Sequence, residues 1–141
     1  MVSTKVVLDT NVIVSAFGWG GKPRCIFDLC IAGRLELITS SAQIAEIQRV
    51  LHYPKFAFSL HQINSIIHIV MEFATLVEVF DNLRVVQDDP SDNVILETAF
   101  RGGASYIVTR DEHLLKLKRF QGVIILTAAD FLLLNLTPQH Q

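Results

Sequence analysis

Four acidic residues are spread along the chain, and each stands where a short apolar run ends or where an adjoining helix begins. In chain order they are Asp9, Glu46, Asp92 and Asp111. In an open α/β sheet, ligands bind beside the carboxyl ends of the strands. Each like-charged pair there costs about 4 kcal/mol at ~4 Å and an effective dielectric of ~20, so four carboxylates must share protons or bind cations. Because oxygen ligands suit Mg²⁺ or Mn²⁺, the pattern predicts a metal-dependent enzyme that cleaves phosphodiester bonds.

Each of these acids also has a purely structural explanation. Asp9, Asp92 and Asp111 stand at predicted helix starts, where aspartate is a favoured cap and the helix dipole stabilises its charge. Taken singly, Asp9 and Asp92 are better explained as caps, and a solvated side chain explains Glu46 as well as a metal ligand does. The metal-site hypothesis rests on recurrence, because acids follow three strand ends on one predicted edge of the sheet. Three acids within five positions around Asp92 also exceed what one helix cap needs.

Composition limits the classes of protein that the chain can form. Its 141 residues, 50% apolar and 18% charged, predict one domain, residues 1–141, with a sizeable core. No apolar run approaches the ~20 residues that span a membrane, and the start of the chain does not resemble a signal peptide. Cys25 and Cys30 do not form a CxxC pair, which predicts buried free thiols in a cytoplasmic protein. The net charge of −2 gives no general attraction to nucleic acid, so such contacts need a local patch or bound metal ions.

Short β-branched runs alternate with longer helical periods along the chain. This alternation predicts an α/β fold, a parallel sheet with helices on both faces. The predicted strands are residues 6–8, 35–39, 75–80, 105–108 and 123–126. The predicted helices are residues 11–17, 23–32, 41–52, 59–73 and 89–101, followed by a terminal helix after a capping pattern at 127–130. Residues 18–23, which are rich in glycine, are predicted to form a flexible loop.

Three further features bear on the site and on assembly. The terminal helix is apolar nearly all round over residues 131–136, which indicates either deep burial or a subunit interface. Glu36 lies at the wrong end of its strand for the site, and Glu97 is expected to face away from Asp92. The five histidines show no convincing ligand spacing and are interpreted as surface or core residues. They are His52, His61, His68, His113 and His140.

Four segments, taken together and in order, resemble the motifs of the PIN domain family. They are Val7-Leu8-Asp9-Thr10-Asn11-Val12, Ser41-Ala42-Gln43-Ile44-Ala45-Glu46, Asp89-Pro90-Ser91-Asp92-Asn93 and Tyr106-Ile107-Val108-Thr109-Arg110-Asp111. The resemblance continues to about residue 127 and so covers essentially the whole chain. It implies a three-layer α/β/α Rossmann-like fold with a central parallel sheet. It also implies a Mg²⁺- or Mn²⁺-dependent endoribonuclease that leaves a 3′-hydroxyl and a 5′-phosphate.

The resemblance also assigns residues and partners. Carried over by position, the catalytic and metal-binding acids are Asp9, Glu46, Asp92 and Asp111, with Asn11, Thr109 and Asp89 in support. The chain is most similar to single-domain prokaryotic members described as toxins of toxin–antitoxin pairs. This likeness implies an RNA substrate, an antitoxin protein as partner, and a homodimer or larger homo-oligomer.

One position departs from the family pattern. Many members have glycine where this chain has Arg110, and a bulky cation there either binds a substrate phosphate or crowds the mouth of the site. Lys22 and Arg24 border the glycine-rich segment and are further candidates for phosphate contact. The lysines after Asp111 are better explained as a solvated helix face. Trp19 either stacks on a base or packs against the domain or a partner.

Two other functions remain open at this stage. In an aspartyl-phosphate phosphatase Asp9 would be the nucleophile, but such enzymes typically carry a second aspartate where Asn11 stands. A PIN-like domain without catalysis would be an RNA- or protein-binding module. Retention of all four acids argues against the binding module, and Arg110 argues mildly for it.

Overall fold

A mostly parallel sheet of six strands forms the centre of the molecule. The computed structural model describes residues 3–80, 85–86 and 89–134. The strands run in the order β3-β2-β1-β4-β6-β5, and all neighbouring pairs are parallel except β5 with β6. Their bounds are β1 Thr4–Leu8, β2 Leu35–Ser40, β3 Ala74–Val77, β4 Tyr106–Val108, β5 Arg119–Phe120 and β6 Val123–Leu126.

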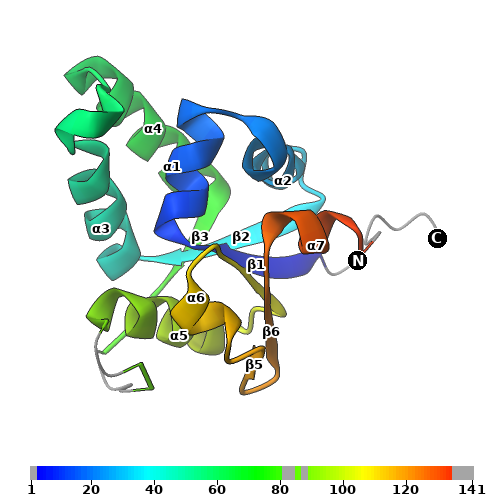
Figure 1. Ribbon diagram of the computed structural model, residues 1–141. Helices are drawn as coiled ribbons and strands as arrows, with labels where there is room; N and C mark the ends of the chain where they lie inside the picture. Colours follow the sequence, from blue (N-terminus) through cyan, green and yellow to red (C-terminus); the bar gives the residue numbers. More distant parts are fainter. Residues whose placement is uncertain (1–2, 81–84, 87–88, 135–141) are drawn as a thin grey trace.

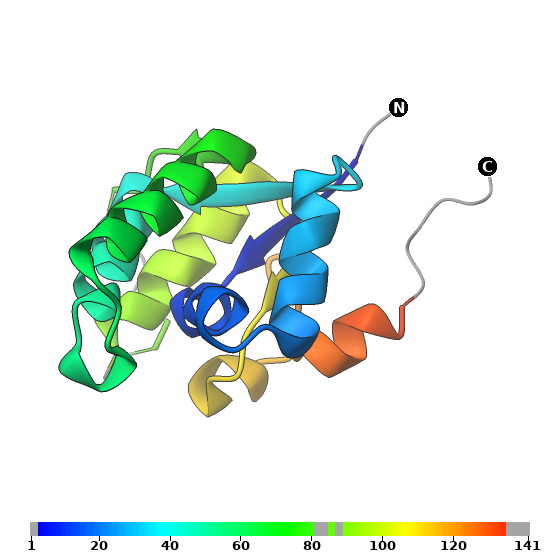
Figure 2. The same ribbon diagram turned by 90° about the horizontal axis from the view of Figure 1, so that it is seen from above.

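Helices cover both faces of this sheet (Figures 1 and 2). The helices are α1 Thr10–Gly18, α2 Gly21–Ile31, α3 Ser41–Leu51, α4 Leu60–Phe73, α5 Pro90–Gly102, α6 Glu112–Leu115 and α7 Ala128–Leu132, with a short 3₁₀ turn at Pro54–Phe56. Helices α1 to α4 and α7 lie on one side of the sheet, and α5 and α6 lie on the other (Figure 1). The predicted three-layer α/β/α fold is therefore confirmed.

The central strand β1 contributes to both layers of the core. Val6 and Leu8 pack with α1 to α4 and α7, whereas Val7 packs with α5 and α6. All three side chains are fully buried, as expected for a strand that is covered on both faces. Asp9, the next residue, therefore leaves the core at the carboxyl edge of the sheet.

Polar side chains at the helix starts explain where several helices begin. Ser59 and Gln62 form a reciprocal capping box at the start of α4. Ser40 caps α3 by accepting a hydrogen bond from the backbone N–H of Gln43. Ser40 and Gln43 do not form a full capping box. The Gln43 side chain does not bond back to the Ser40 backbone but donates to the carbonyl oxygen of Leu8 at 2.6 Å. This bond ties α3 to the end of β1.

The structure corrects several predicted boundaries. Residues 18–23 do not form a loop, because α1 continues to Gly18 and α2 begins at Gly21, with Gly20 at a φ of +78°. Strand β3 ends at Val77 rather than at residue 80, and its neighbour β2 ends at the same level. The two-residue strand β5 was not predicted, because a strand this short leaves no periodic signal.

Two further predictions concern burial. Cys30 is buried but Cys25 is exposed, so the prediction of two buried thiols is wrong for Cys25. In the predicted terminal helix Phe131 is buried, whereas Leu133 is 81% exposed. Deep burial is therefore wrong for this part of the helix, and residues 135–136 lie outside the described part of the chain. No helix in the described ranges is long and apolar enough to cross a lipid bilayer.

Candidate metal centre

The ends of β1 and β4 place Asp9 and Asp111 at one edge of the sheet. The two strands pair in parallel as far as Leu8 and Val108, and the backbone N–H of Asp9 donates to the carbonyl oxygen of Val108 at 2.9 Å. Asp111 follows Val108 by three residues and caps α6 by accepting from the N–H groups of His113 and Leu114. The predicted convergence of strand-end acids is thus present for these two residues.

Two threonines connect the acids to one another. The Thr109 hydroxyl donates to Asp9 Oδ2 at 2.6 Å and accepts from the backbone N–H of Asp111 at 3.0 Å. Thr10 donates through its backbone N–H to Asp9 Oδ1 at 2.7 Å and through its hydroxyl to Glu46 Oε1 at 2.7 Å. Both threonines are buried. They therefore fix the orientation of the Asp9 and Glu46 carboxylates, and Thr109 also holds the backbone of Asp111.

Glu46 reaches the site because Gln43, one helical turn before it, bonds α3 to the end of β1. Gln43 is fully buried, donates to Leu8 and accepts from the Thr39 hydroxyl at 2.6 Å. Residues three apart on a helix share a face, so Glu46 lies above Gln43 and points toward the end of β1. Its second oxygen lies 3.9 Å from a guanidinium nitrogen of Arg49.

Asp89 and Asp92 come from the first turn of α5, on the other side of the sheet. Asp89 caps the helix by accepting from the N–H groups of Ser91 and Asp92. Asn93 anchors the preceding segment through two hydrogen bonds with the backbone of Val86, at 2.7 and 2.8 Å. At the other end of α5, Gly102 lies so close to Ile38 that a Cβ atom would clash with the Ile38 side chain. Both ends of the α5 segment are therefore held in place.

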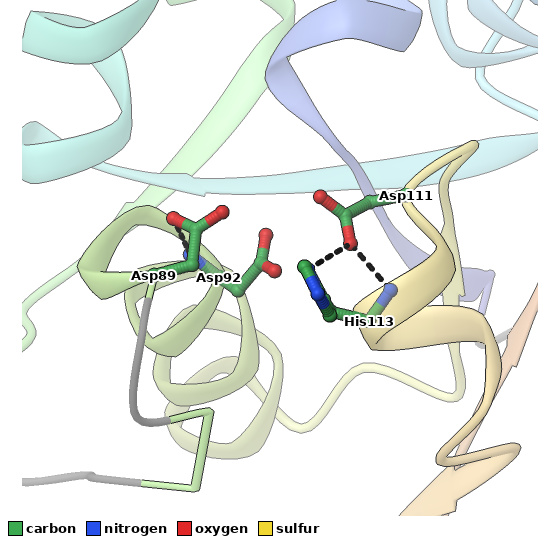
Figure 3. Close-up of side chains that lie close together, drawn as sticks. All are labelled: Asp89, Asp92, Asp111 and His113. Atoms are coloured by element: carbon green, nitrogen blue, oxygen red, sulfur yellow. Dashed lines mark hydrogen bonds and ion pairs between the residues drawn. The ribbon is translucent and has the colours of Figure 1, made fainter.

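Four side chains from α5 and α6 meet within ligand distance of one another. One ligand atom from each of Asp89, Asp92, Asp111 and His113 lies within 4.8 Å of the others. Figure 3 shows Asp89 and Asp92 at the start of α5 facing Asp111 and His113 at the start of α6. His113 is exposed, in agreement with its interpretation as a surface residue, but its proximity to the three acids was not predicted.

Asp92 carries the strongest electrostatic perturbation of the site. The residue is only 3% exposed, and its Oδ2 atom is buried without a hydrogen-bond partner among the described residues. Burial, together with the smaller effect of the charges of Asp111, Asp89 and Asp9, raises the pKa of this carboxyl from 3.8 to about 8. Without a cation, this carboxyl therefore retains its proton at neutral pH.

Asp9 shows the same effect to a smaller extent. The net pKa of its carboxyl is raised from 3.8 to about 6, mainly by burial and to a smaller extent by the charges of Glu46 and Asp111. The hydrogen bonds from Thr109 and Thr10 lower this pKa and so oppose the effect of burial. Perturbed carboxyl groups gathered in a cavity are typical of functional sites.

The residues fit a divalent cation. A buried carboxylate oxygen without a partner costs free energy unless a proton or a cation satisfies it. Asp92 Oδ2 is such an atom, and it lies among oxygen donors that suit Mg²⁺ and Mn²⁺. The acidic cluster is therefore suited to a metal ion, with Asp92 as its most buried donor.

The acids line a cavity of about 320 Å³, which also contains Thr10, Arg49 and Tyr53. A second cavity of about 590 Å³ lies beside it and shares residues including Asn11, Lys55 and Asp111 with the first. Trp19 and Arg110 line only this second cavity. Trp19 is 67% exposed and meets the edge of the Phe56 ring at 5.7 Å between centroids.

Of the predicted substrate-binding residues, Arg110 lines a cavity, whereas Lys22 and Arg24 do not. Arg110 donates to the Ser15 hydroxyl at 3.2 Å and lines the second cavity, so its side chain does not fill the acidic one. Arg24 pairs with Asp28 at 2.8 Å and lies over the Phe17 ring, and neither Arg24 nor Lys22 lines the two cavities.

Three other side chains differ in their relation to the site. Asn11 is exposed and lines both cavities, but the hydrogen bonds to Asp9 come from the two threonines. Glu97 is buried and accepts from the Phe80 N–H and the Arg101 guanidinium. Lys55 was not predicted as a site residue. It lies in the 3₁₀ turn after α3, where no periodic pattern indicates which way a side chain points.

Comparison with known proteins agrees with this geometry. The model of the PIN domain family matches residues 5–113, a range that contains all four acids. The chain belongs to the PIN domain family. Membership implies a nuclease-type hydrolase, and PIN domains typically bind a divalent metal ion, which agrees with the acidic cluster.

Proteins similar to this PIN domain in sequence or in fold come from archaea and bacteria. The uncharacterized protein MJ1680 of Methanocaldococcus jannaschii is 31% identical over 121 residues, which cover 83% of this chain and 77% of that protein. The structure of VapBC2 from Rickettsia felis bound to a promoter DNA fragment has a TM-score of 0.63 at 20% identity, covering 86% of this chain and 97% of that one. PAE2754 from Pyrobaculum aerophilum has a TM-score of 0.62 at 18% identity, covering 96% and 91%. Both structures share the fold of this PIN domain.

The raised pKa of Asp92 predicts how the stability of the metal-free PIN domain depends on pH. The folded state binds this proton more tightly than the unfolded state, so the stabilisation is complete below pH 4 and is lost as the pH rises toward 8. The variant Asp92→Asn should therefore be more stable than the wild type at pH 8, by on the order of 3 kcal/mol. The difference should shrink toward pH 5.

Chemical denaturation in a chelator at several pH values measures this difference. Glu112→Gln is the matched control, since Glu112 is exposed beside the cluster but outside it. A constant difference between Asp92→Asn and wild type across this pH range would contradict the assignment of a strained, buried carboxylate.

Because of the position of Arg110, removal of its side chain should weaken the binding of RNA, the expected substrate, without changing the affinity for metal ions. Because its guanidinium lies in the second cavity, Arg110→Gln should weaken binding of single-stranded RNA, most strongly at low salt. The affinity for Mn²⁺ should stay within about twofold of wild type, since exposed charges at a distance are screened. Fluorescence anisotropy with labelled RNA and calorimetry with Mn²⁺ measure the two quantities. Tighter metal binding with unchanged RNA binding would instead show that Arg110 crowds the acidic cavity.

Proposed function

We propose that this PIN domain is a metal-dependent endoribonuclease that hydrolyses phosphodiester bonds of RNA. In this proposal Asp9, Glu46, Asp92 and Asp111 are the catalytic and metal-binding acids, and Asp89 and Thr109 support them. The observation that carries the proposal is the buried, unpartnered Oδ2 atom of Asp92, which faces Asp89 and Asp111. A buried oxygen of this kind needs a proton or a cation, and a bound cation would supply the chemistry of hydrolysis.

The acids would have different roles, which follow from their surroundings. Asp92 and Asp111 would hold one divalent ion, and Asp9 would reach it from the end of β1. When bound, Mg²⁺ or Mn²⁺ lowers the pKa of a water molecule and neutralises charge that develops on the phosphate. Glu46 is oriented by the Thr10 hydroxyl and lines the same cavity, so it would accept a proton from the attacking water.

The second cavity would hold the RNA strand beside the cleaved bond. Since the whole chain carries a net charge of −2, phosphate contacts must come from local cations. Arg110 and Lys55 line this cavity, and the exposed ring of Trp19 offers a surface on which a base can stack. Lys22 and Arg24 would contact the strand only outside the two cavities.

We further propose that this ribonuclease is the toxin of a toxin–antitoxin pair. The fold shared with VapBC2 of Rickettsia felis supports the proposal. An antitoxin would then cover the acidic cavity or place a basic side chain in it. The exposed Leu133 and Leu134 at the end of α7 support self-association as a homodimer or larger homo-oligomer. A cytoplasmic location remains a prediction from sequence, as does the single domain over residues 1–141.

The alternative of a non-catalytic binding module receives less support. The argument from sequence for a binding module was that the bulky Arg110 side chain crowds the mouth of the site. Arg110 lies instead in the second cavity, and the acidic cavity is lined by all four acids. We therefore propose the nuclease in preference to the binding module.

Cleavage of single-stranded RNA tests the proposed activity. The wild type should cut the RNA with Mn²⁺ or Mg²⁺ and stop when EDTA is added. Asp9→Asn should reduce cleavage to the EDTA background, because it removes a charge that two buried threonines orient toward the site. Glu72→Gln, on the exposed face of α4, is the matched control and should cut like wild type. Equal cleavage by wild type and Asp9→Asn would show that the activity comes from a contaminating nuclease.

A further inference from the structure

We propose that the His113 imidazole is a ligand of the acidic centre and gives it a preference for Mn²⁺ over Mg²⁺. The inference rests on the proposed function, because it concerns the same centre, but it assigns a ligand of a different chemical class. The four acids were expected to bind either ion through oxygen alone.

The geometry allows one ion to reach both helices. A divalent ion holds its oxygen or nitrogen ligands at about 2.0–2.2 Å, so opposite ligands stand about 4.0–4.4 Å apart. The ligand atoms of Asp89, Asp92, Asp111 and His113 all lie within 4.8 Å of one another. A contraction of a few tenths of an ångström therefore suffices, and rotation of the exposed His113 side chain at the start of α6 supplies it.

Asp92 provides an independent indication that this cluster takes a ligand. Its Oδ2 atom is buried without a partner, and the residue is 3% exposed. Figure 3 shows its carboxylate between Asp89 and the pair formed by Asp111 and His113. A cation bound to this oxygen would thus have the imidazole as a near neighbour.

The surroundings of His113 leave its ring available for coordination. The helix cap holds its backbone, because Asp111 Oδ1 accepts from the His113 N–H at 2.7 Å. The side chain is 59% exposed, and its Nδ1 atom lies 3.7 Å from that same oxygen, beyond hydrogen-bond distance. The ring is therefore positioned by α6 but is not engaged in a strong bond of its own.

The chemistry of the donor set then favours one ion over the other. Mg²⁺ prefers oxygen ligands in a near-ideal octahedron and keeps several waters, whereas imidazole is a good ligand for transition ions. Mn²⁺ accepts the three carboxylates and also gains from a nitrogen donor. An alternative role for His113 is a simple ion pair with Asp111, in which a protonated ring would compete with a metal ion.

Electron paramagnetic resonance of bound Mn²⁺ distinguishes these roles without measuring activity. With the full chain and Mn²⁺, the spin-echo modulation should show coupling to an imidazole ¹⁴N nucleus. His113→Asn should abolish this coupling, and His68→Asn, an exposed histidine on α4, should retain it. Loss of the nitrogen ligand should weaken Mn²⁺ binding by about tenfold and change Mg²⁺ binding by less than about twofold.

Each other outcome would overturn the inference. Mn²⁺ bound without imidazole coupling, or no Mn²⁺ binding, would show that His113 is not a ligand. A similar loss of affinity for both ions in His113→Asn would show a structural or ion-pair role, and thermal unfolding of the metal-free variant checks that it folds. The outcome is separable from that of the proposed function: imidazole coupling together with cleavage unaffected by Asp9→Asn would retain the ligand and reject the nuclease.

Discussion

Carboxylates held close together at one end of a parallel sheet are the constraint on which the rest of this structure depends. Their repulsion works against folding, and burial of Asp92 and Asp9 adds to the cost, as the raised pKa values of both groups show. The fold offsets this cost locally with hydroxyl and amide donors, most directly with Thr10 and Thr109. The free-energy cost of burying the unpartnered Asp92 Oδ2 remains, and a bound cation would remove it. Relief of this cost would therefore contribute to the free energy of metal binding.

Two buried polar side chains and one glycine turn this constraint into a defined geometry. Gln43 joins α3 to the end of β1 and so brings Glu46 over the sheet edge. Asn93 fixes the segment before α5, and Gly102 permits the close approach of α5 to Ile38. Neither Gln43 nor Asn93 is charged, yet each determines where a charged side chain lies. Their burial explains why the acids come from different layers of the fold and still face one cavity.

The sequence predicted most of the fold because its strands and helices have clear periods and caps, as at Ser59 and Asp89. It failed where local geometry depends on positive φ or on very short elements, as at Gly20 and β5. Within the site, Asp9, Asp92 and Asp111 were predicted because each follows a strand or lies in the first turn of a helix, whereas Glu46 was predicted from the family motif. His113 was missed because side chains from α5 and α6 meet only through tertiary packing, which no spacing within one helix reveals. The positions of Arg110 and Lys55 likewise depend on side-chain direction in irregular segments.

Anomalous X-ray scattering from a crystal grown with Mn²⁺ tests the central claim most directly. The account predicts an anomalous peak within about 2.5 Å of Asp92 Oδ2 and in the first coordination sphere of Asp111, because that buried oxygen needs a cation. Crystals of Asp92→Asn should show a weaker peak or none at this position. An ordered Asp92 with no peak beside it at saturating Mn²⁺, or a peak confined to acids elsewhere on the surface, would contradict the account.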